Sequence, residues 1–482
     1  MTKETAWKWI DENKDRLTAI SDKIWGYAEL GLMETRSSKL LSDTLESHGF
    51  RVERGVAGMP TAFIATYGKT KPVIGVMGEF DALPGISNKP VPHKEWLVED
   101  GPGHGCGHHI HGTSGMAAAI AIRYWLEETG HKGSVKFFGT PAEENFMGKV
   151  YMARAGLFDD VEMCMSHHPD SINAASMGSS TAVNNVKFEF FGKTAHAAGS
   201  PEQGRSALDG VELMNIGVNY LREHVIQEAR FHYVIEEGGG QPNVVPDYAR
   251  SWYYIRAPEK DQLEAIYKRI IKIAEGAAMM TETQLKVDFI SGLYNLIPNK
   301  VICETLTENM NKIGAPQFSK EEKAFAAEIS KTVSRESKLE DLRRQKVPDY
   351  MKYADLDMAE DILPVFGEDY CAAGSTDVGD ISWITPTVEM QSAMYPLGSP
   401  AHSWQWTCMG KQSSSHKMLV FTAKTMAGTG IDFITKPELL QKAKDEHKQR
   451  LGKRKYVSPI PAEIQPPLAM AAANWEKNKG KQ

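Results

Sequence analysis

The chain has 482 residues, which is too long for one ordinary hydrophobic core, so we expect two domains. Its apolar fraction of 41% and charged fraction of 24% are typical of a soluble globular protein. The net charge of −7 without a basic stripe argues against a nucleic-acid partner. No segment approaches the roughly 20 apolar residues that a membrane span needs.

The five cysteines are scattered and odd in number, which favours free thiols in a reducing compartment over a disulfide framework. Residues 1–8 are amphipathic and charged, and they lack the apolar core and cleavage site of a secretory signal. These features together predict a cytoplasmic protein.

Apolar residues recur at helical spacing over residues 4–50, with a break at Gly31, and they predict helices there. This stripe is best explained as the face that packs on a core. Short strands are predicted at 50–52 and 62–65.

The next run, residues 73–81, is nearly continuously apolar, as in a strand that is buried on both faces. It ends in Glu79 and Asp81. Because open α/β sheets place their sites beyond the carboxyl ends of the strands, these carboxylates are either site residues or ordinary turn residues.

A loop at 86–102 leads to residues 103–109, where three histidines and one cysteine are spaced by glycines. Cys106 and His108 are two positions apart, so both can turn inward from a loop or from the start of the helix predicted up to about residue 129. Thiolate and imidazole are good ligands for divalent metals of the zinc type. The alternative is a buried cysteine beside solvated histidines, so further ligands must come from elsewhere in the chain.

Two more buried strands end in side chains that can bind metal. The strand at 135–139 precedes Glu143 and Glu144, and the strand at 161–166 precedes His167 and His168. Adjacent glutamates point in different directions, so one can bind a metal while the other faces a bound water. An enclosed carboxylate pair repels unless a cation compensates it. Three such strand endings beside the cysteine-histidine cluster predict a metal site at the carboxyl edge of the sheet.

From about residue 181 the pattern changes to half-exposed strands and long helices. Strands are predicted at 182–191, 231–235, 250–256 and 284–289, with helices at 206–228 and 260–278. This β-α-β-β-α-β order is the split ferredoxin-like motif. We therefore predict an inserted domain at 181–293, with 1–180 and 294–482 forming one catalytic domain.

The remaining segments carry weaker signals. Residues 318–350 are charged and predict helices on the surface, and a further helix is predicted at 416–426. Asp377 and Asp380 are interpreted as turn residues. The proline-rich stretch at 456–469 predicts an extended segment along the surface.

Several motifs resemble the metallo-aminoacylase and carboxypeptidase family. They are Cys106-Gly107-His108, Pro141-Ala142-Glu143-Glu144, His168-Pro169, Gly192-Lys193-Thr194-Ala195-His196-Ala197, Asn243-Val244-Val245-Pro246-Asp247 and His402-Ser403. Within the amidohydrolase branch, segments 103–108, 374–380 and 401–405 resemble the p-aminobenzoyl-glutamate hydrolase subgroup. The resemblance implies an α/β fold: a metallopeptidase-like catalytic domain with a central mixed sheet, and an inserted ferredoxin-like α+β domain for dimerisation that acts as a lid.

The resemblance also implies roles for single residues. Cys106, in a bridging position, with His108, Glu144, His168 and His402 would bind two divalent metal ions, Zn or Mn, with Co or Ni as further options. Glu143 would be the general base. Asp81 would contact a metal-binding residue from the side away from the metal. His196 and Asn243 would reach across a dimer to the scissile carbonyl, and Arg256 would grip the carboxylate of the substrate.

The implied function is metal-dependent hydrolysis of the amide bond in an N-acyl or N-aroyl amino acid, most simply one like p-aminobenzoyl-glutamate. A homodimer through the inserted domain is expected. The alternatives are an aromatic aminohydrolase with the same metal site and a subunit that acts with a related chain. Departures from the family pattern at Glu79, His109 and His111 leave their roles open, as does the choice between His167 and His168.

Overall fold

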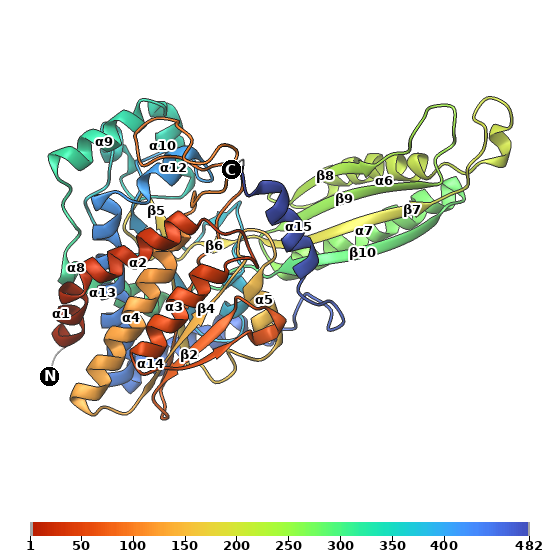
Figure 1. Ribbon diagram of the computed structural model, residues 1–482. Helices are drawn as coiled ribbons and strands as arrows, with labels where there is room; N and C mark the ends of the chain where they lie inside the picture. The colour runs from red at the N-terminus through yellow and green to blue at the C-terminus, as the bar shows by residue number, and fades with distance from the viewer. Residues whose placement is uncertain (1–2, 481–482) are drawn as a thin grey trace.

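The computed structural model describes residues 3–480, so the parts of the predictions that fall on residues 1–2 and 481–482 lie outside it. Figure 1 shows two parts: a main body that contains the first helices of the chain, and a narrow arm that projects from it.

The main body is built on a mixed six-stranded sheet in the order β1-β2-β4-β3-β5-β12. Its strands are β1 (Arg51–Arg54), β2 (Phe63–Tyr67), β3 (Val73–Gly78), β4 (Ser134–Gly139), β5 (Met163–Asp170) and β12 (Thr387–Ala393). Strand β3 pairs in parallel with β4 and β5, and β12 pairs in parallel with β5. The carboxyl ends of β3, β4 and β5 therefore meet at one edge, as the strand-ending pattern predicts.

Residues alternate between two hydrophobic cores, one on each face of this sheet. Val76 and Phe137 pack in the core under α4 (His108–Thr129), whereas Met77 and Phe138 pack in the opposite core. The helices of the main body are α1 (Glu4–Glu12), α2 (Lys14–Tyr27), α3 (Thr35–Ser47), α4, α5 (Gly148–Arg154), α8 (Lys300–Ile313), α9 (Lys320–Ser330), α10 (Arg335–Arg344), α11 (Val378–Ser382), α12 (Trp404–Met409), α13 (Ser413–Thr435), α14 (Pro437–Leu451) and α15 (Leu468–Asn478).

The arm is an antiparallel four-stranded sheet in the order β10-β7-β9-β8, with two helices on one face. Its elements are β7 (Ala182–Phe191), α6 (Ala207–Leu221), β8 (Arg230–Glu237), β9 (Tyr248–Ala257), α7 (Lys260–Thr281) and β10 (Gln284–Leu293). This order and connectivity are those of the ferredoxin-like motif, as predicted. The limits at 181 and 293 and the roles in dimerisation and closure stay predictions.

Three predicted elements differ in extent. The helix predicted at 206–228 ends at Leu221, the last residue of α6 that packs on the core of the arm. The helix predicted at 416–426 is longer in the structure and continues through Gly428 and Gly430 to the end of α13 (Ser413–Thr435). These glycines permit close packing, since a Cβ on Gly428 would lie 2.7 Å from Asn309 Oδ1. Strand β5 continues to Asp170, so His167 and His168 lie within it.

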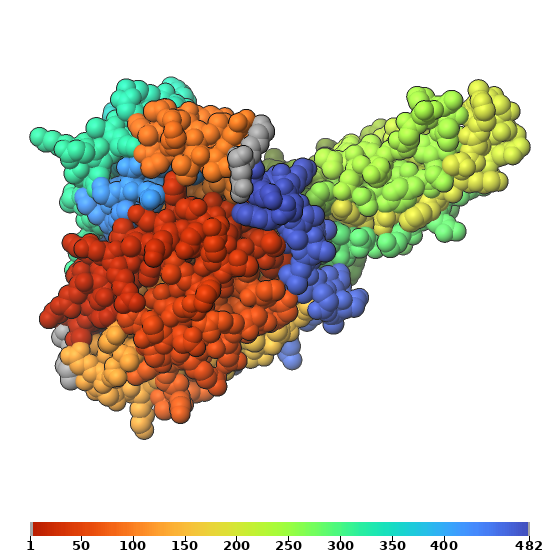
Figure 2. All heavy atoms as spheres, viewed as in Figure 1, coloured from red at the N-terminus to blue at the C-terminus, as the bar shows by residue number. Residues whose placement is uncertain are grey.

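The C-terminal segment crosses the junction between the two parts. Residues 452–467 are without helix or strand, as the proline-rich stretch predicts, and α15 follows. Tyr294, just after β10, donates to the carbonyl of Val457, and Arg154 donates to the carbonyls of Pro461 and Ile464. Figure 2 shows this segment lying between body and arm. Among the described helices, none combines the length and apolarity that spanning a bilayer requires.

Candidate metal centre

The loop at residues 103–107 delivers Cys106 and His108 to the carboxyl edge of the sheet. Gly107 has φ 78°, and a Cβ there would lie 2.7 Å from Pro169 Cγ, so the turn requires glycine. His108 is the first residue of α4, and both side chains are buried.

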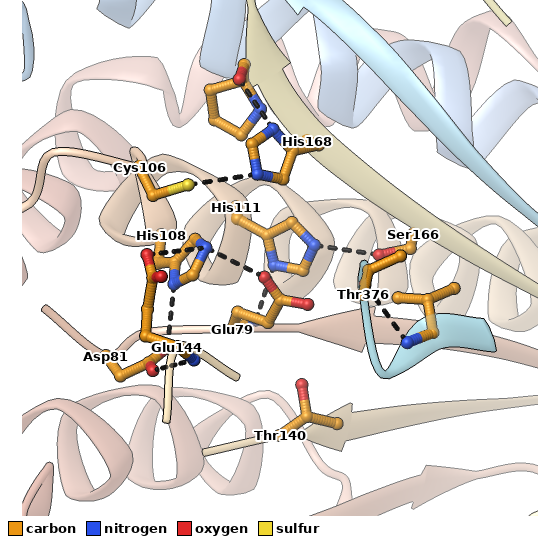
Figure 3. Close-up of polar contacts among 12 residues, drawn as sticks. Glu79, Asp81, Cys106, His108, His111, Thr140, Glu144, Ser166, His168 and Thr376 are labelled. Carbon is orange, nitrogen blue, oxygen red and sulfur yellow. Dashed lines mark hydrogen bonds and ion pairs between the residues drawn. The ribbon is translucent and has the colours of Figure 1, made fainter. Parts of the chain in front are cut away.

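Cys106, His108 and His168 bring a thiol and two imidazoles together (Figure 3). Cys106 Sγ lies 3.2 Å from His168 Nε2. Cys106 also belongs to a second group with Glu144 and His402, and within each group the ligand atoms lie within 4.8 Å of one another. Cys106 is thus common to both groups, as expected of a residue in a bridging position.

Hydrogen bonds orient both imidazoles. His108 Nδ1 lies 2.8 Å from Asp81 Oδ1, and His168 Nδ1 lies 2.8 Å from its neighbour's carbonyl at Pro169. Each ring therefore presents Nε2 to the cluster. Asp81 Oδ2 also accepts from the backbone N–H of Glu144 at 2.9 Å, so one carboxylate links the first group to the second.

The second group forms through two strained segments. His402 Nε2 lies 3.3 Å from Glu144 Oε2, and the backbone N–H of His402 donates to the carbonyl of Gly105 at 3.0 Å. His402 has φ 55°, and Ala142, next to Glu143, has φ 61°. Non-glycine residues with positive φ angles are uncommon, and they concentrate at functional sites.

The other histidines of the region form hydrogen bonds with residues outside the cluster. His104 and His109 lie 3.0 Å from the carbonyls of Ile24 and Gly410, and His111 Nδ1 accepts from the N–H of Glu79. His167 points to the opposite face of the sheet, where Nε2 lies 2.7 Å from Ser392 Oγ. Of the two adjacent histidines on β5, the structure brings only His168 to the cluster.

A buried ion-pair network that the sequence did not reveal lies behind His108. Lys149 Nζ lies 2.5 Å from Glu79 Oε1 and 2.5 Å from Asp377 Oδ1, and all three side chains are buried. Glu79 Oε2 lies 3.1 Å from His108 Nε2. Asp377 lies in a turn before α11, as interpreted, but it is also buried and paired with Lys149 at the start of α5, whereas the interpretation of Asp380 as a turn residue was wrong because Asp380 lies within α11. Asp380 is also buried and accepts from the N–H of Tyr294 and the hydroxyl of Tyr456.

Burial and charge shift the pKa values of the cluster. Burial raises the pKa of Glu144 to about 7, against the effect of His108, and burial with Glu144 raises the pKa of the Cys106 thiol. Burial, Glu79 and Glu144 raise the pKa of Glu143. Burial with His108 and His168 lowers the pKa of His402 to about 4.

This donor set fits divalent cations. In the part of the chain that the structure describes, Glu144 Oε1 is buried without a hydrogen-bond partner, and His108 Nε2 lies near Glu79 Oε2 without forming a hydrogen bond. Glu79, Asp81, Glu144 and Asp377 crowd the site, and among residues 3–480 Lys149 is the one lysine or arginine that forms an ion pair with any of them. A thiol, imidazoles and carboxylates with an excess of negative charge are what zinc and similar ions require.

The cluster opens into a cavity of about 570 Å³ between body and arm. Glu143 lies in its wall with four of the five predicted ligands, namely Cys106, Glu144, His168 and His402. From the arm, Tyr254 and Arg256 complete the wall, and Arg256 Nη1 donates to Ser375 Oγ at 3.1 Å. The structure therefore brings Arg256 to the same cavity as the cluster.

His196 and Asn243 do not reach this cavity. Both are exposed and adjacent at the far end of the arm, where the N–H of Ala197 donates to the carbonyl of Asn243. Val183 lines the cavity and Phe191 is eight residues further along β7, which at ~3.3 Å per residue is about 26 Å away. His196 lies beyond Phe191, so within this chain it is remote from the metal cluster.

Comparisons with known proteins identify the family. Residues 75–440 match the model of peptidase family M20/M25/M40. The chain is 39% identical to the B subunit of p-aminobenzoyl-glutamate hydrolase from Escherichia coli, over 95% of this chain and 97% of that protein. It is 28% identical to the Xaa-Arg dipeptidase of Mus musculus, over 95% of each chain.

A solved structure supports the fold. A dinuclear metal-binding peptidase of the M20 family from Bacillus subtilis superposes with a TM-score of 0.56 at 16% identity, over 86% of this chain and 98% of that one. The predictions of fold class and family are confirmed. The chain belongs to peptidase family M20/M25/M40 and is a metal-dependent hydrolase.

Proposed function

We propose that the protein hydrolyses the amide bond of an N-aroyl or N-acyl amino acid, with a p-aminobenzoyl-glutamate-like substrate. One observation carries the proposal: a general-base candidate, Glu143, and a carboxylate-binding candidate, Arg256, line one cavity with the metal-ligand cluster. The likeness over almost the whole length to the B subunit of p-aminobenzoyl-glutamate hydrolase supports the substrate class.

In this proposal two divalent ions would be held by Cys106, which is common to both groups, with His108 and His168 in one group and Glu144 and His402 in the other. Zn and Mn are the favoured ions, with Co and Ni as further options. When bound, such a pair polarises the amide carbonyl and activates a water.

The chain's own residues then move the proton. Glu143, with its raised pKa, accepts a proton from the attacking water and delivers it to the leaving nitrogen. Asp81 keeps His108 and the backbone of Glu144 in place. Arg256 binds the carboxylate of the amino-acid half and thereby orients the amide over the cluster.

We further propose a homodimer through the arm, in which His196 and Asn243 of one protomer complete the cavity of its partner. The exposed position of both residues at the far end of the arm supports this arrangement. Edge strand β8 of the arm, with exposed Val234 and Ile235, offers a surface for pairing.

A hetero-oligomer with a related chain is the second candidate, because the 39% identical relative is one of the subunits of its enzyme. Activity of the purified chain alone would favour the homodimer, and activity only after a related subunit is added would favour the second candidate. An aromatic aminohydrolase would release ammonia without forming a carboxylic acid, which mass spectrometry of the products distinguishes.

The direct test of the proposed function is Glu143→Gln in the metal-loaded protein. We expect metal content to stay at the wild-type level and hydrolysis of p-aminobenzoyl-glutamate to fall by roughly 10²–10⁴-fold, because general-base catalysis is removed. Glu282→Gln, an exposed carboxylate of the arm, is the control and should keep full activity. Near-normal rates for Glu143→Gln would refute the assignment.

A further inference from the structure

The sheet of the arm presents its helix-free face to the cavity. On β8 and β9, Phe231, Tyr253 and Ile255 point into the core under α6 and α7. Residues of the opposite parity therefore point to the other face, where Tyr254 and Arg256 line the cavity. This helix-free face is the wall that a bound substrate meets from the side of the arm.

Register places a second arginine beside Arg256 on this face. Arg230 on β8 pairs directly with Arg256 on β9, and His232 pairs with Tyr254. Directly opposed residues have Cβ atoms about 4.5–5.5 Å apart and point to the same face. The pKa of His232 is lowered, first by partial burial and then by Arg256, Arg222 and Arg230.

No carboxylate compensates these two arginines among the described residues. Arg256 donates to Ser375 Oγ, and Arg230 Nη1 donates to the carbonyls of Gln227 and Ala229. The Nε and Nη2 groups of Arg230 make no hydrogen bond within the described part of the chain, so they can bind an anion. Further out on the same face the charges are paired, since Glu236 binds both Lys187 and Arg250.

We infer that Arg230 and Arg256 form a two-cation subsite that selects an amino-acid half with two carboxylates, aspartate or glutamate. Arg256 takes the carboxylate next to the scissile amide, and Arg230 takes the side-chain carboxylate. The inference rests on the proposed function and deepens it, because it makes Arg230 the residue that determines specificity.

The test compares N-(4-aminobenzoyl)-glutamate with N-(4-aminobenzoyl)-glutamine, which differ in the side-chain charge. Wild type should prefer the glutamate substrate in kcat/KM, and Arg230→Gln should reduce that preference about 10- to 100-fold, as expected for a charge-assisted hydrogen bond. Arg256→Gln should lower kcat/KM for both substrates. Arg250→Gln removes a charge from the same face six residues away and should keep the wild-type preference.

A binding measurement separates this inference from the proposed function. Calorimetric titration of the metal-loaded chain with L-glutamate and L-glutamine should show tighter binding of glutamate in wild type and equal binding in Arg230→Gln. If no N-acyl amino acid is hydrolysed, the proposed function fails while the calorimetry still decides on Arg230. Equal treatment of glutamate and glutamine by wild type, or an unchanged preference in Arg230→Gln, would overturn the inference.

Discussion

At the scale of single residues, hydrogen bonds orient the side chains of the candidate metal centre. His108 and His168 each use Nδ1 for an oxygen acceptor, which leaves Nε2 for the cluster. The residues that follow the strands and the spacing of Cys106 and His108 predicted that the metal site lies at this edge of the sheet. The choice between His167 and His168 required the structure, because adjacent residues on a strand point to opposite faces and sequence alone does not say which face holds the site.

The raised pKa values of Cys106 and Glu144 predict that metal affinity depends on pH. Without metal, Cys106 keeps its proton throughout the neutral range and Glu144 titrates near pH 7, whereas His402 is already neutral above about pH 4. The pKa of His108 is also raised, because the lowering effect of burial is outweighed by Glu79 and Asp81. Binding must therefore release protons from Cys106 and His108, and an additional Glu144 proton at pH 6. Affinity should rise with pH, and more steeply below pH 7 than above it.

Metal titration in weakly buffered solution, with proton release recorded at both pH values, checks this expectation. Release should increase from pH 8 to pH 6 in wild type, and Glu144→Gln should lose the increase. Proton release that does not change with pH in wild type would contradict the account.

At the scale of elements, the network of Lys149, Glu79 and Asp377 ties together the end of β3, the start of α5 and the start of α11. Sequence reasoning missed it because a single lysine in a helix has no pattern, and because Asp377 stands in a segment that resembles an ordinary turn. The network forms only when segments more than 200 residues apart come together in the fold. No local sequence pattern predicts such a contact.

Lys149→Met should destabilise the main body by about 3–5 kcal/mol, because it leaves two buried carboxylates without their cation. Denaturant unfolding of the metal-free protein measures this. Lys136→Met removes the exposed pair with Asp160 and should cost only about 0–1 kcal/mol. An equal effect of the two variants would mean that the buried network adds nothing beyond a surface ion pair.

At the scale of the whole molecule, the arm separates two sets of functional candidates. Arg256 lies at its base in the cavity, whereas His196 and Asn243 lie at its far end. The sequence predicted the ferredoxin-like order of the arm from its alternating strands, but it could not predict this separation. Distances along a strand become distances in space only when the strand direction relative to the cavity is known.

Mixing of inactive variants tests whether His196 acts in a partner chain. Glu143→Gln and His196→Ala should each be inactive alone. Co-refolded in equal amounts, they should recover about one quarter of wild-type activity, because half of the dimers are mixed and each mixed dimer has one complete cavity. If mixing restores nothing while mixed dimers form, His196 does not act across the dimer.

The most direct measurement of the central claim is anomalous diffraction from crystals of the zinc-loaded protein. The account predicts two peaks that share Cys106 Sγ, one beside His108 and His168 and the other beside Glu144 and His402. A single peak, or peaks remote from Cys106, would contradict it.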